Sequence, residues 1–495
     1  MSAVTGSELR RDEGICTYPG ADGAREEGVS EALEAAESRP SAPMAALSRT
    51  RLMLEAPIVP TLLRLAWPNV AVMLAQAAVG LIEAYFVGWL GTDALAGVAL
   101  VFPVLMLMQM MSGGAIGGGI ASAIARALGG NRREEADLLV MQSLLIAVVL
   151  GVLFGGAALA FGPALYRAMG GGDAPVLAAA LLYSNTLFLG APLLWLLNCL
   201  ASVIRGTGNM LVPALVTCAG TLALLVLSPA LIVGWPPFPR LEVAGGAVAV
   251  LITYGAGSLA LALYIAAGRS LVRFRWHLLR PRWHAIDEIL RVGGIAALNT
   301  VLTNLTIVLV TAMIGRFGAA AIAGYGIGSR LEYLLIPLVF GLGAPLVAMV
   351  GTNIGAGQVA RAQRIAWTGA AIAFAMTEAI GLGAAMFPAA WIGLFDRSPE
   401  AIAMGTLYLH RVAPLYGAFG GGMALYFSSQ GAGRMAWPLA AGVLRIVLAA
   451  GGGWVAFRLL GAGPAGLFVM VGAGLLVFGA TIAAALARGA WGGRA

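Results

Sequence analysis

The residues of this sequence that are best suited to chemistry are a few carboxyl and guanidinium groups inside long apolar segments. Glu83 lies near the end of the apolar run 62–87, and Arg330 and Glu332 lie within the run 319–350. A charged side chain in the core of a membrane costs at least ~2.5 kcal/mol, so such residues are rare and usually face a cavity. A carboxyl group in such a position can bind and release a proton.

Glu83 is the first candidate for a proton-coupling residue. It lies within about eight residues, roughly 12 Å, of the predicted outer end of its helix at 1.5 Å per residue. Removal from water disfavours the charged form of a carboxyl group, so Glu83 could take up a proton on one side of a membrane and release it on the other. The alternative is a buried acid that only ties its helix to a neighbour through hydrogen bonds.

Arg330 and Glu332 lie about 12 residues, roughly 18 Å, into their predicted helix, near the middle of a membrane. Residues i and i+2 do not face each other on a helix, so each of the two needs another partner. Two interpretations are equally open, contact with a substrate in a cavity and a polar network that holds helices together. Glu378 and Arg445 are also deep, and their roles stay open.

Uncharged residues complete the candidate set. Asparagines such as Asn198 and Asn304 could relay hydrogen bonds, although interhelical polar contacts in membranes average only ~0.6 kcal/mol and are mostly structural. Met108 belongs to a methionine cluster at 106–111 that could line a promiscuous apolar cavity, with ordinary packing as the alternative. The candidates for a substrate cavity are therefore Arg330, Glu332, Asn304, Asn198 and Met108.

Twelve apolar segments must position these residues. Each is long enough to cross the ~30 Å hydrocarbon layer as a helix. The chain of 495 residues is 60% hydrophobic and 11% charged, with a mean hydropathy of +0.89. A soluble domain has about 25% charged residues, so a water-soluble enzyme is excluded and an all-α integral membrane protein is expected. The segments cover roughly residues 62–87, 94–125, 138–162, 175–201, 211–234, 243–267, 292–314, 319–350, 365–391, 403–430, 437–457 and 463–487.

The arginines orient these segments. Loops after the second, fourth, sixth, eighth and tenth predicted helices, together with the C-terminal tail, carry most of the loop arginines. By the positive-inside rule we expect a multi-pass protein of the inner (plasma) membrane with both termini cytoplasmic, which agrees with an even number of helices. The net charge of +7 then reflects topology and contact with membrane lipids, and no nucleic-acid partner is expected.

Missing residue types exclude several kinds of chemistry. The sequence has no lysine, whereas a Walker A loop and a pyridoxal-phosphate Schiff base both require one. Three cysteines and three histidines are too few and too scattered for a disulfide framework or a metal cluster. No cofactor and no metal site are expected.

An internal repeat divides the chain into two halves. Gly-Trp-Leu-Gly at 88–91 recurs as Gly-Arg-Phe-Gly at 315–318, and Tyr183 recurs as Tyr408. Because each half holds six predicted helices, both start on the same side of the membrane and form parallel lobes, a common plan of transporters. The predicted parts are a disordered cytoplasmic tail (1–55), an N-lobe with helices 1–6 (56–267), a cytoplasmic inter-lobe loop (268–291), a C-lobe with helices 7–12 (292–488) and a cytoplasmic tail (489–495). The true start could be Met44 or Met53.

Several motifs, in their order along the chain, resemble the multidrug and toxic compound extrusion (MATE) family. They are Leu-Ala-Trp-Pro at 65–68, Phe-Val-Gly-Trp-Leu-Gly at 86–91, Arg-Gly-Thr-Gly at 205–208, Gln-Gly-Ala-Gly at 430–433 and Leu-Phe-Asp-Arg-Ser-Pro-Glu at 394–400. The resemblance covers about residues 55–488. It implies a V-shaped, twelve-helix antiporter that acts as a monomer and exports an amphipathic small molecule against H⁺ or Na⁺, and it makes Glu378 a structural residue on a peripheral helix.

The sequence departs from the family pattern at some ion ligands. Glu83 stands where the family usually has an aspartate, so a carboxyl group is kept with one more methylene. Leu224 and Ser228 stand where many members have an Asn/Asp pair, and Asn304 lies near the position of an acid in the Na⁺-using branch. These departures favour H⁺ over Na⁺ as the coupling ion.

Other functions are weaker alternatives. A flippase for a lipid-linked saccharide, from the same superfamily, usually has about fourteen helices and several cavity arginines. A membrane enzyme would need a nucleophile, a metal or an acid pair at a membrane interface, and no such cluster occurs at the predicted helix ends. A passive channel would need a symmetric pore ring, which two unequal halves do not supply. We therefore expect a transporter that is not an enzyme.

Overall fold

The computed structural model describes residues 42–169, 173–459 and 461–492, and these residues are helical apart from their connections. Helices dominate because a backbone inside a membrane must satisfy its own hydrogen bonds. The first half of the chain contains α2 (Ala42–Glu55), α3 (Ile58–Gly88), α4 (Thr92–Gln109), the π-helical η1 (Met110–Ile116), α5 (Gly117–Gly129), α6 (Arg133–Ala168), α7 (Ala174–Leu189), α8 (Ala191–Gly206), α9 (Leu211–Pro229), the π-helical η2 (Ala230–Gly234) and α10 (Val243–Ala266).

The second half follows a related order, with α12 (Ala319–Gly355) continuous where the first half is divided into α4, η1 and α5. It contains the short 3-10 helix η3 (Trp276–Leu278), α11 (Trp283–Ile314), η4 (Gly315–Phe317), α12 (Ala319–Gly355), α13 (Val359–Met386), α14 (Pro388–Ile392), α15 (Pro399–Val412), η5 (Ala413–Leu415), α16 (Tyr416–Gly431), α17 (Ala436–Ile446), the π-helical η6 (Val447–Gly452), α18 (Gly453–Arg458) and α19 (Gly463–Ala487). The predicted all-helical membrane architecture is confirmed.

The number of spanning helices differs slightly from the expected twelve. Among the described residues, ten helices are long and apolar enough to cross a membrane, and α7 with α8, bent by 49°, adds an eleventh. The helix predicted at 403–430 is divided into α15 and α16 by η5. Pro414 within η5 has no N–H to donate and its ring crowds the preceding turn, which favours a break in the helix there.

Part of the predicted N-terminal tail is ordered. Residues 1–41 lie outside the described residues, but residues 42–55 form helix α2 instead of the disordered segment expected for them. The side chain of Met53 is only 2% exposed, and its carbonyl accepts a hydrogen bond of 3.1 Å from the Asn353 amide. Burial of this apolar side chain stabilises α2 against the rest of the protein.

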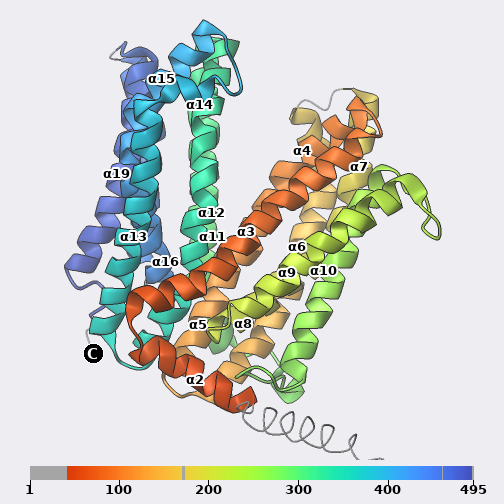
Figure 1. The fold of residues 1–495 in the computed structure, drawn as a ribbon, viewed down its shortest axis with the longest axis vertical. Coiled ribbons are helices and arrows are strands. Elements are labelled where there is room, and N and C mark those ends of the chain that lie inside the picture. The colour runs from red at the N-terminus through yellow and green to blue at the C-terminus, as the bar shows by residue number, and fades with distance from the viewer. Residues whose placement is uncertain (1–41, 170–172, 460, 493–495) are drawn as a thin grey trace, which may run out of the picture.

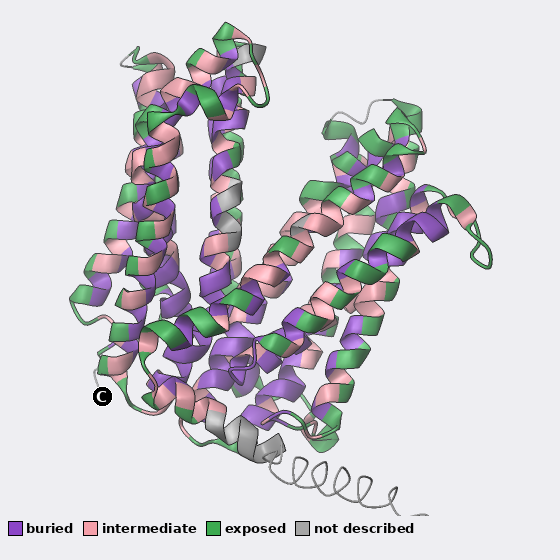
Figure 2. Ribbon diagram, in the orientation of Figure 1, coloured by how far each residue is buried: buried purple, intermediate pink, exposed green. Residues whose placement is uncertain are grey.

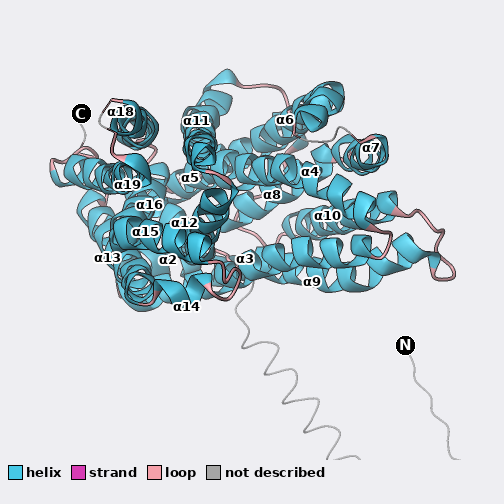
Figure 3. Cartoon of the chain, turned by 90° about the horizontal axis from the view of Figure 1, so that it is seen from above, coloured by secondary structure: helices cyan, strands magenta, loops and turns pink. Residues whose placement is uncertain are grey.

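The helices form two bundles that meet at one end and diverge toward the other (Figure 1). Seen from above, α11–α19 lie on one side and α6–α10 on the other (Figure 3). Buried residues gather at the end where the bundles meet, which includes α5 and α8 (Figure 2). We call the α3–α10 group the N-terminal bundle, the α11–α19 group the C-terminal bundle, and the end where they meet the junction.

Helices α5 and α12 make the tightest contact at the junction. A Cβ placed on Gly129 would lie 2.0 Å from the Thr352 carbonyl oxygen, and a Cβ on Gly355 would lie 2.0 Å from the Arg126 carbonyl oxygen. Glycine therefore allows the two backbones to touch, as at other close crossings of membrane helices. Each contact involves one residue from each half of the chain.

Polar contacts surround this crossing. The Ser122 hydroxyl donates to the Gln430 carbonyl at 2.5 Å, and the Gln430 amide donates to the Gly114 carbonyl at 3.2 Å. An ion pair of 3.0 Å joins Arg126 on α5 to Glu288 on α11. The junction is thus closed by both packing and hydrogen bonds between the two bundles.

Candidate functional site

Glu83 is a buried carboxyl group of the N-terminal bundle. It lies near the end of α3, and its residue is 4% exposed. The Tyr183 hydroxyl on α7 donates a hydrogen bond of 2.9 Å to Glu83 Oε2. Glu83 Oε1 is also buried and has no hydrogen-bond partner within the described chain. One oxygen of this carboxyl group is therefore positioned by the protein and the other is free to hold a proton.

Two further polar side chains extend the surroundings of Glu83. Tyr254 on α10 is close enough for its hydroxyl to interact electrostatically with the Glu83 carboxyl group. The Gln109 amide on α4 donates a long hydrogen bond of 3.5 Å to the Tyr254 hydroxyl. Four helices, α3, α4, α7 and α10, thus bring polar groups together around one carboxyl group.

A cavity of about 50 Å³ lies beside this cluster, between α3, α4, α8, α9 and α10. Such a volume can hold a few water molecules or a small polar group. Its lining is rich in polar side chains and, over the residues that line it, contains one arginine and no acid. The polar lining residues are Gln76, Gln109, Asn198, Arg205, Thr217, Thr221, Thr253 and Tyr254.

The C-terminal bundle has a related arrangement. The Tyr408 hydroxyl on α15 donates a hydrogen bond to Glu332 Oε1 on α12. Tyr183 and Tyr408 occupy equivalent positions of the internal repeat, and each binds a carboxyl group, although the two acids come from helices that are not equivalent. The repeated tyrosine therefore binds a buried or partly buried acid in each bundle.

Arg445 supplies a positive charge near Glu332. It lies on α17, is 8% exposed, and interacts electrostatically with Glu332. Its guanidinium group stacks over the Phe419 ring at 5.1 Å and the Phe478 ring at 6.0 Å. No ion pair within 4.0 Å joins Arg445 to an acid among the residues that the structure describes. Cation–π contacts, which are favourable when the cation is removed from water, hold this side chain instead.

The other predicted cavity residues lie apart from one another. Arg330 is exposed, and its guanidinium group lies 5.6 Å from the centre of the Phe395 ring. Asn304 is exposed and donates to the Thr300 carbonyl of its own helix at 2.9 Å. Met108 is 1% exposed and packs in the core of the N-terminal bundle, so it does not line the cavity described above.

Asn198 is the predicted cavity residue that lines this cavity. Its amide also donates to the Ser112 hydroxyl at 2.8 Å. Glu378 accepts a hydrogen bond of 2.7 Å from the Gly417 backbone N–H, which favours a structural role. Within the described chain, no group of three or more His, Cys, Asp or Glu residues could hold a metal ion.

Several residues at these sites were not predicted as site residues. In the sequence, Tyr183 and Tyr408 stand out only as members of the internal repeat, and this repeat is the signal that could have assigned them to the acids. Arg205 stands out in the sequence only as the first residue of the Arg-Gly-Thr-Gly motif. Gln109 and Tyr254 carry no signal in one sequence, because their proximity depends on how separate helices pack.

Comparison with known proteins identifies the family. The family model described as MatE matches residues 68–230 and 296–455, one stretch in each half of the chain. The chain belongs to the MATE family. The resemblance in its motifs is thereby confirmed, and the protein is a multi-pass membrane transporter, as expected, rather than an enzyme.

Curated relatives of this MATE protein differ in what their names say they transport. The chain is 28% identical over 373 residues to a protein of Shewanella oneidensis named FAD transporter, covering 74% of this chain and 81% of that protein. It is 26% identical over 400 residues to the probable multidrug resistance protein YoeA of Bacillus subtilis, covering 79% and 83% of the two chains.

Solved structures show the same fold. A crystal structure of MATE in the bent conformation superposes with a TM-score of 0.81 at 23% identity, covering 89% of this chain and 97% of that one. An outward-facing multidrug resistance MATE family transporter superposes with a TM-score of 0.77 at 24% identity, covering 88% and 97%. At this identity the likeness concerns the arrangement of helices.

Proposed function

We propose that this MATE transporter is a secondary active antiporter, which exports amphipathic organic solutes or drugs across the inner membrane in exchange for inward-flowing H⁺. The observation that carries the proposal is the environment of Glu83. Its carboxyl group is buried in a spanning helix, holds one hydrogen bond from Tyr183 and pairs with no cation in the described chain. Such a group can change its charge by binding a proton, which is the event that coupling requires.

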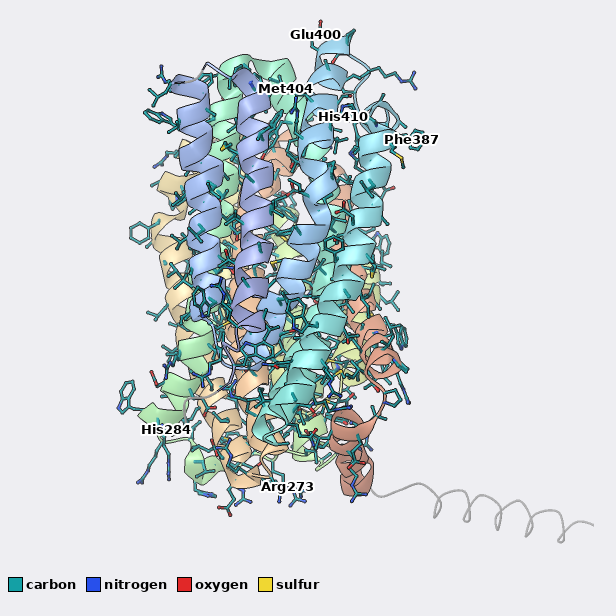
Figure 4. The ribbon with its side chains drawn as sticks, turned by 90° about the vertical axis from the view of Figure 1, so that its left-hand side faces the viewer. Arg273, His284, Phe387, Glu400, Met404 and His410 are labelled. Atoms are coloured by element: carbon teal, nitrogen blue, oxygen red, sulfur yellow. The ribbon has the colours of Figure 1, made fainter. Side chains whose placement is uncertain are left out.

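The distribution of charged loops supports one orientation of the protein in the membrane. Arg273 and His284 lie at the same end of the molecule, and Glu400 and His410 lie at the opposite end (Figure 4). The arginine-rich loop that contains Arg273 then faces the cytoplasm under the positive-inside rule, with both termini on that side. In this orientation the junction is cytoplasmic, and the bundles diverge toward the outside.

Helix α3 offers a way for protonation to affect the junction. Near its end, Glu83 contacts α7 through Tyr183. Nearer its start, the Asn69 amide donates to the Phe340 carbonyl at 2.9 Å and the Gly341 carbonyl at 3.2 Å, both on α12. Helix α3 thus carries the coupling acid and contacts the opposite bundle, so a change of packing at Glu83 can alter the contact between the bundles. Alternating access requires such a link.

The departures from the family pattern support H⁺ over Na⁺. A hard cation such as Na⁺ prefers several oxygen ligands. Leu224, at a position where many members have a polar ligand, is buried and apolar, and one of the Glu83 oxygens already accepts from Tyr183. The relatives named as multidrug resistance proteins support organic solutes as the exported substrates. We expect the transporter to act as a monomer.

The test uses purified protein in liposomes with an imposed pH gradient. Movement of H⁺ and of fluorescent solutes, ethidium and flavin mononucleotide (FMN) among them, is recorded with and without Na⁺ for the wild type, Glu83→Gln and Glu83→Asp. We expect solute-dependent H⁺ movement that needs no Na⁺, is abolished in Glu83→Gln and is retained in Glu83→Asp.

Glu378→Gln is the matched control, because it removes another intramembrane carboxyl group but keeps an oxygen that can accept from Gly417. It is expected to transport like the wild type. Normal coupling in Glu83→Gln would refute the role of Glu83, and transport that requires Na⁺ would refute H⁺ as the coupling ion.

A further inference from the structure

The cavity of the N-terminal bundle contains a guanidinium group with no partner. Arg205 lies in the last turn of α8, and no hydrogen bond or ion pair of its side chain occurs among the described residues. A guanidinium group has five N–H donors, which are normally satisfied by carboxylates, phosphates, carbonyls or water. Since its nitrogen atoms are not fully buried, these donors are available to a bound molecule.

The rest of the lining does not neutralise this charge. The polar side chains that share the cavity with Arg205 are amides and hydroxyls, and none of the lining residues is acidic. Glu83, the nearest acid along α3, lies seven residues beyond the lining residue Gln76 and is not part of the lining. The cavity therefore carries a net positive charge in a region of low dielectric, where a charge is strongly felt.

The threonine hydroxyls in the lining already donate elsewhere. The hydroxyls of Thr217 and Thr221 donate to carbonyls of their own helix at 2.9 and 3.1 Å, and Thr253 does the same at 2.8 Å. The side chains of Arg205 and Gln76 make no hydrogen bond within the described chain, and the Tyr254 hydroxyl, which accepts from Gln109, can also donate. A cluster of free donors with a positive charge is complementary to an anionic oxygen.

We propose that this cavity binds an anionic group, a phosphate or a carboxylate, and that Arg205 is the residue that recognises it. The group belongs either to an exported organic anion or to the headgroup of an anionic lipid. Where it belongs to the exported solute, the inference rests on the proposed function and adds organic anions to the substrates. The relative named FAD transporter handles a solute that bears phosphate, in agreement with this substrate class.

The test compares two flavins that differ in one phosphate. Binding of FMN and of riboflavin is measured by flavin fluorescence with the full-length protein in nanodiscs of zwitterionic lipid, without a pH gradient. We expect the wild type to prefer FMN, and Arg205→Gln to weaken FMN binding by about 10- to 150-fold, the range for losing hydrogen bonds to a charged group. Riboflavin binding should change little, and Arg205→Lys should keep part of the preference because it keeps the charge.

Arg64→Gln is the matched control, because Arg64 is an exposed arginine of α3 that does not line the cavity. It should bind both flavins like the wild type. The lipid source is tested by native mass spectrometry of protein from nanodiscs with anionic phosphatidylglycerol. Fewer retained phosphatidylglycerol molecules in Arg205→Gln than in Arg64→Gln would assign the cavity to a lipid headgroup.

Two results together would overturn the proposal, and the first of them needs only the wild type. Equal affinity for FMN and riboflavin together with no Arg205-dependent lipid would refute it. Because binding is measured without a pH gradient, a failure of the anion-binding proposal can be distinguished from a failure of the proposed antiport. The proposed antiport is tested by whether Glu83→Gln abolishes the coupling of solute movement to H⁺ movement.

Discussion

The glycine contacts at the junction predict how the two bundles exchange between conformations. In Gly129→Ala the new methyl group would lie 2.0 Å from the Thr352 carbonyl oxygen, and in Gly355→Ala it would lie 2.0 Å from the Arg126 carbonyl oxygen. An ordinary contact needs about 3.5 Å, so α5 and α12 must separate by about 1.5 Å. The obstacle is backbone, which cannot rotate away as a flexible side chain can.

The size of the effect follows from overpacking. Adding a methyl group to a well-packed contact costs about 1–3 kcal/mol. Because the cost falls on the closed junction and is relieved when the bundles separate there, the balance should shift toward the junction-open state by about 5- to 140-fold, at 1.4 kcal/mol for each tenfold change. A transporter whose junction is held open should also export its substrate more slowly, since each transport cycle must pass through the state with the closed junction.

Distances between spin labels measure this shift. Labels at Glu134→Cys and Gln358→Cys, exposed positions at the starts of α6 and α13, report the separation of the bundles at the junction in a background without native cysteines. Gly294→Ala is the control, because a Cβ at Gly294 would have no atom within 4 Å. An unchanged distance distribution in Gly129→Ala and Gly355→Ala, or an equal shift in Gly294→Ala, would refute the reasoning.

Two further predictions concern single hydrogen bonds. Tyr183→Phe removes the hydrogen bond to Glu83 Oε2, and because that bond favours the ionised carboxyl group, proton release should require a higher pH. The pH profile of transport in liposomes should therefore move to higher pH, and an unchanged profile would show that Tyr183 has no role in coupling. Glu378→Leu leaves the Gly417 N–H without its acceptor and should lower the free energy of unfolding by about 1–3 kcal/mol, whereas Glu378→Gln should not. Unfolding in denaturant compares the two variants, and equal stability would argue against a structural role of Glu378.

Glu83 shows what can be predicted from one sequence. Its depth follows from counting residues along a helix of fixed rise, and its chemistry follows from the cost of a charge in a membrane. Its partner Tyr183 is 100 residues away in the chain, so their contact depends on how α3 and α7 pack. Pairing of this kind leaves no periodic signal in the sequence.

Met108 shows where the hydrophobic pattern of a sequence carries no information. In a soluble helix the polar face distinguishes the outside from the core. The helix that contains Met108 is apolar on all sides, so its composition does not say which face meets a cavity, and the structure places this side chain in the core. The break in the helix predicted at 403–430 could have been anticipated from Pro414, whereas the burial of Met53 depends on contacts with distant segments.

The crossing of α5 and α12 also constrains how the two halves of the chain can evolve. Gly129 meets the backbone of the second half, and Gly355, at the equivalent repeat position, meets the backbone of the first. The contact is reciprocal, as in an isologous dimer in which one surface patch is used twice. The two halves therefore behave at this point as a fused homodimer. A larger residue at either glycine is tolerated only if the backbone of the opposite half moves away. Sequence changes in the two halves are therefore coupled at this crossing.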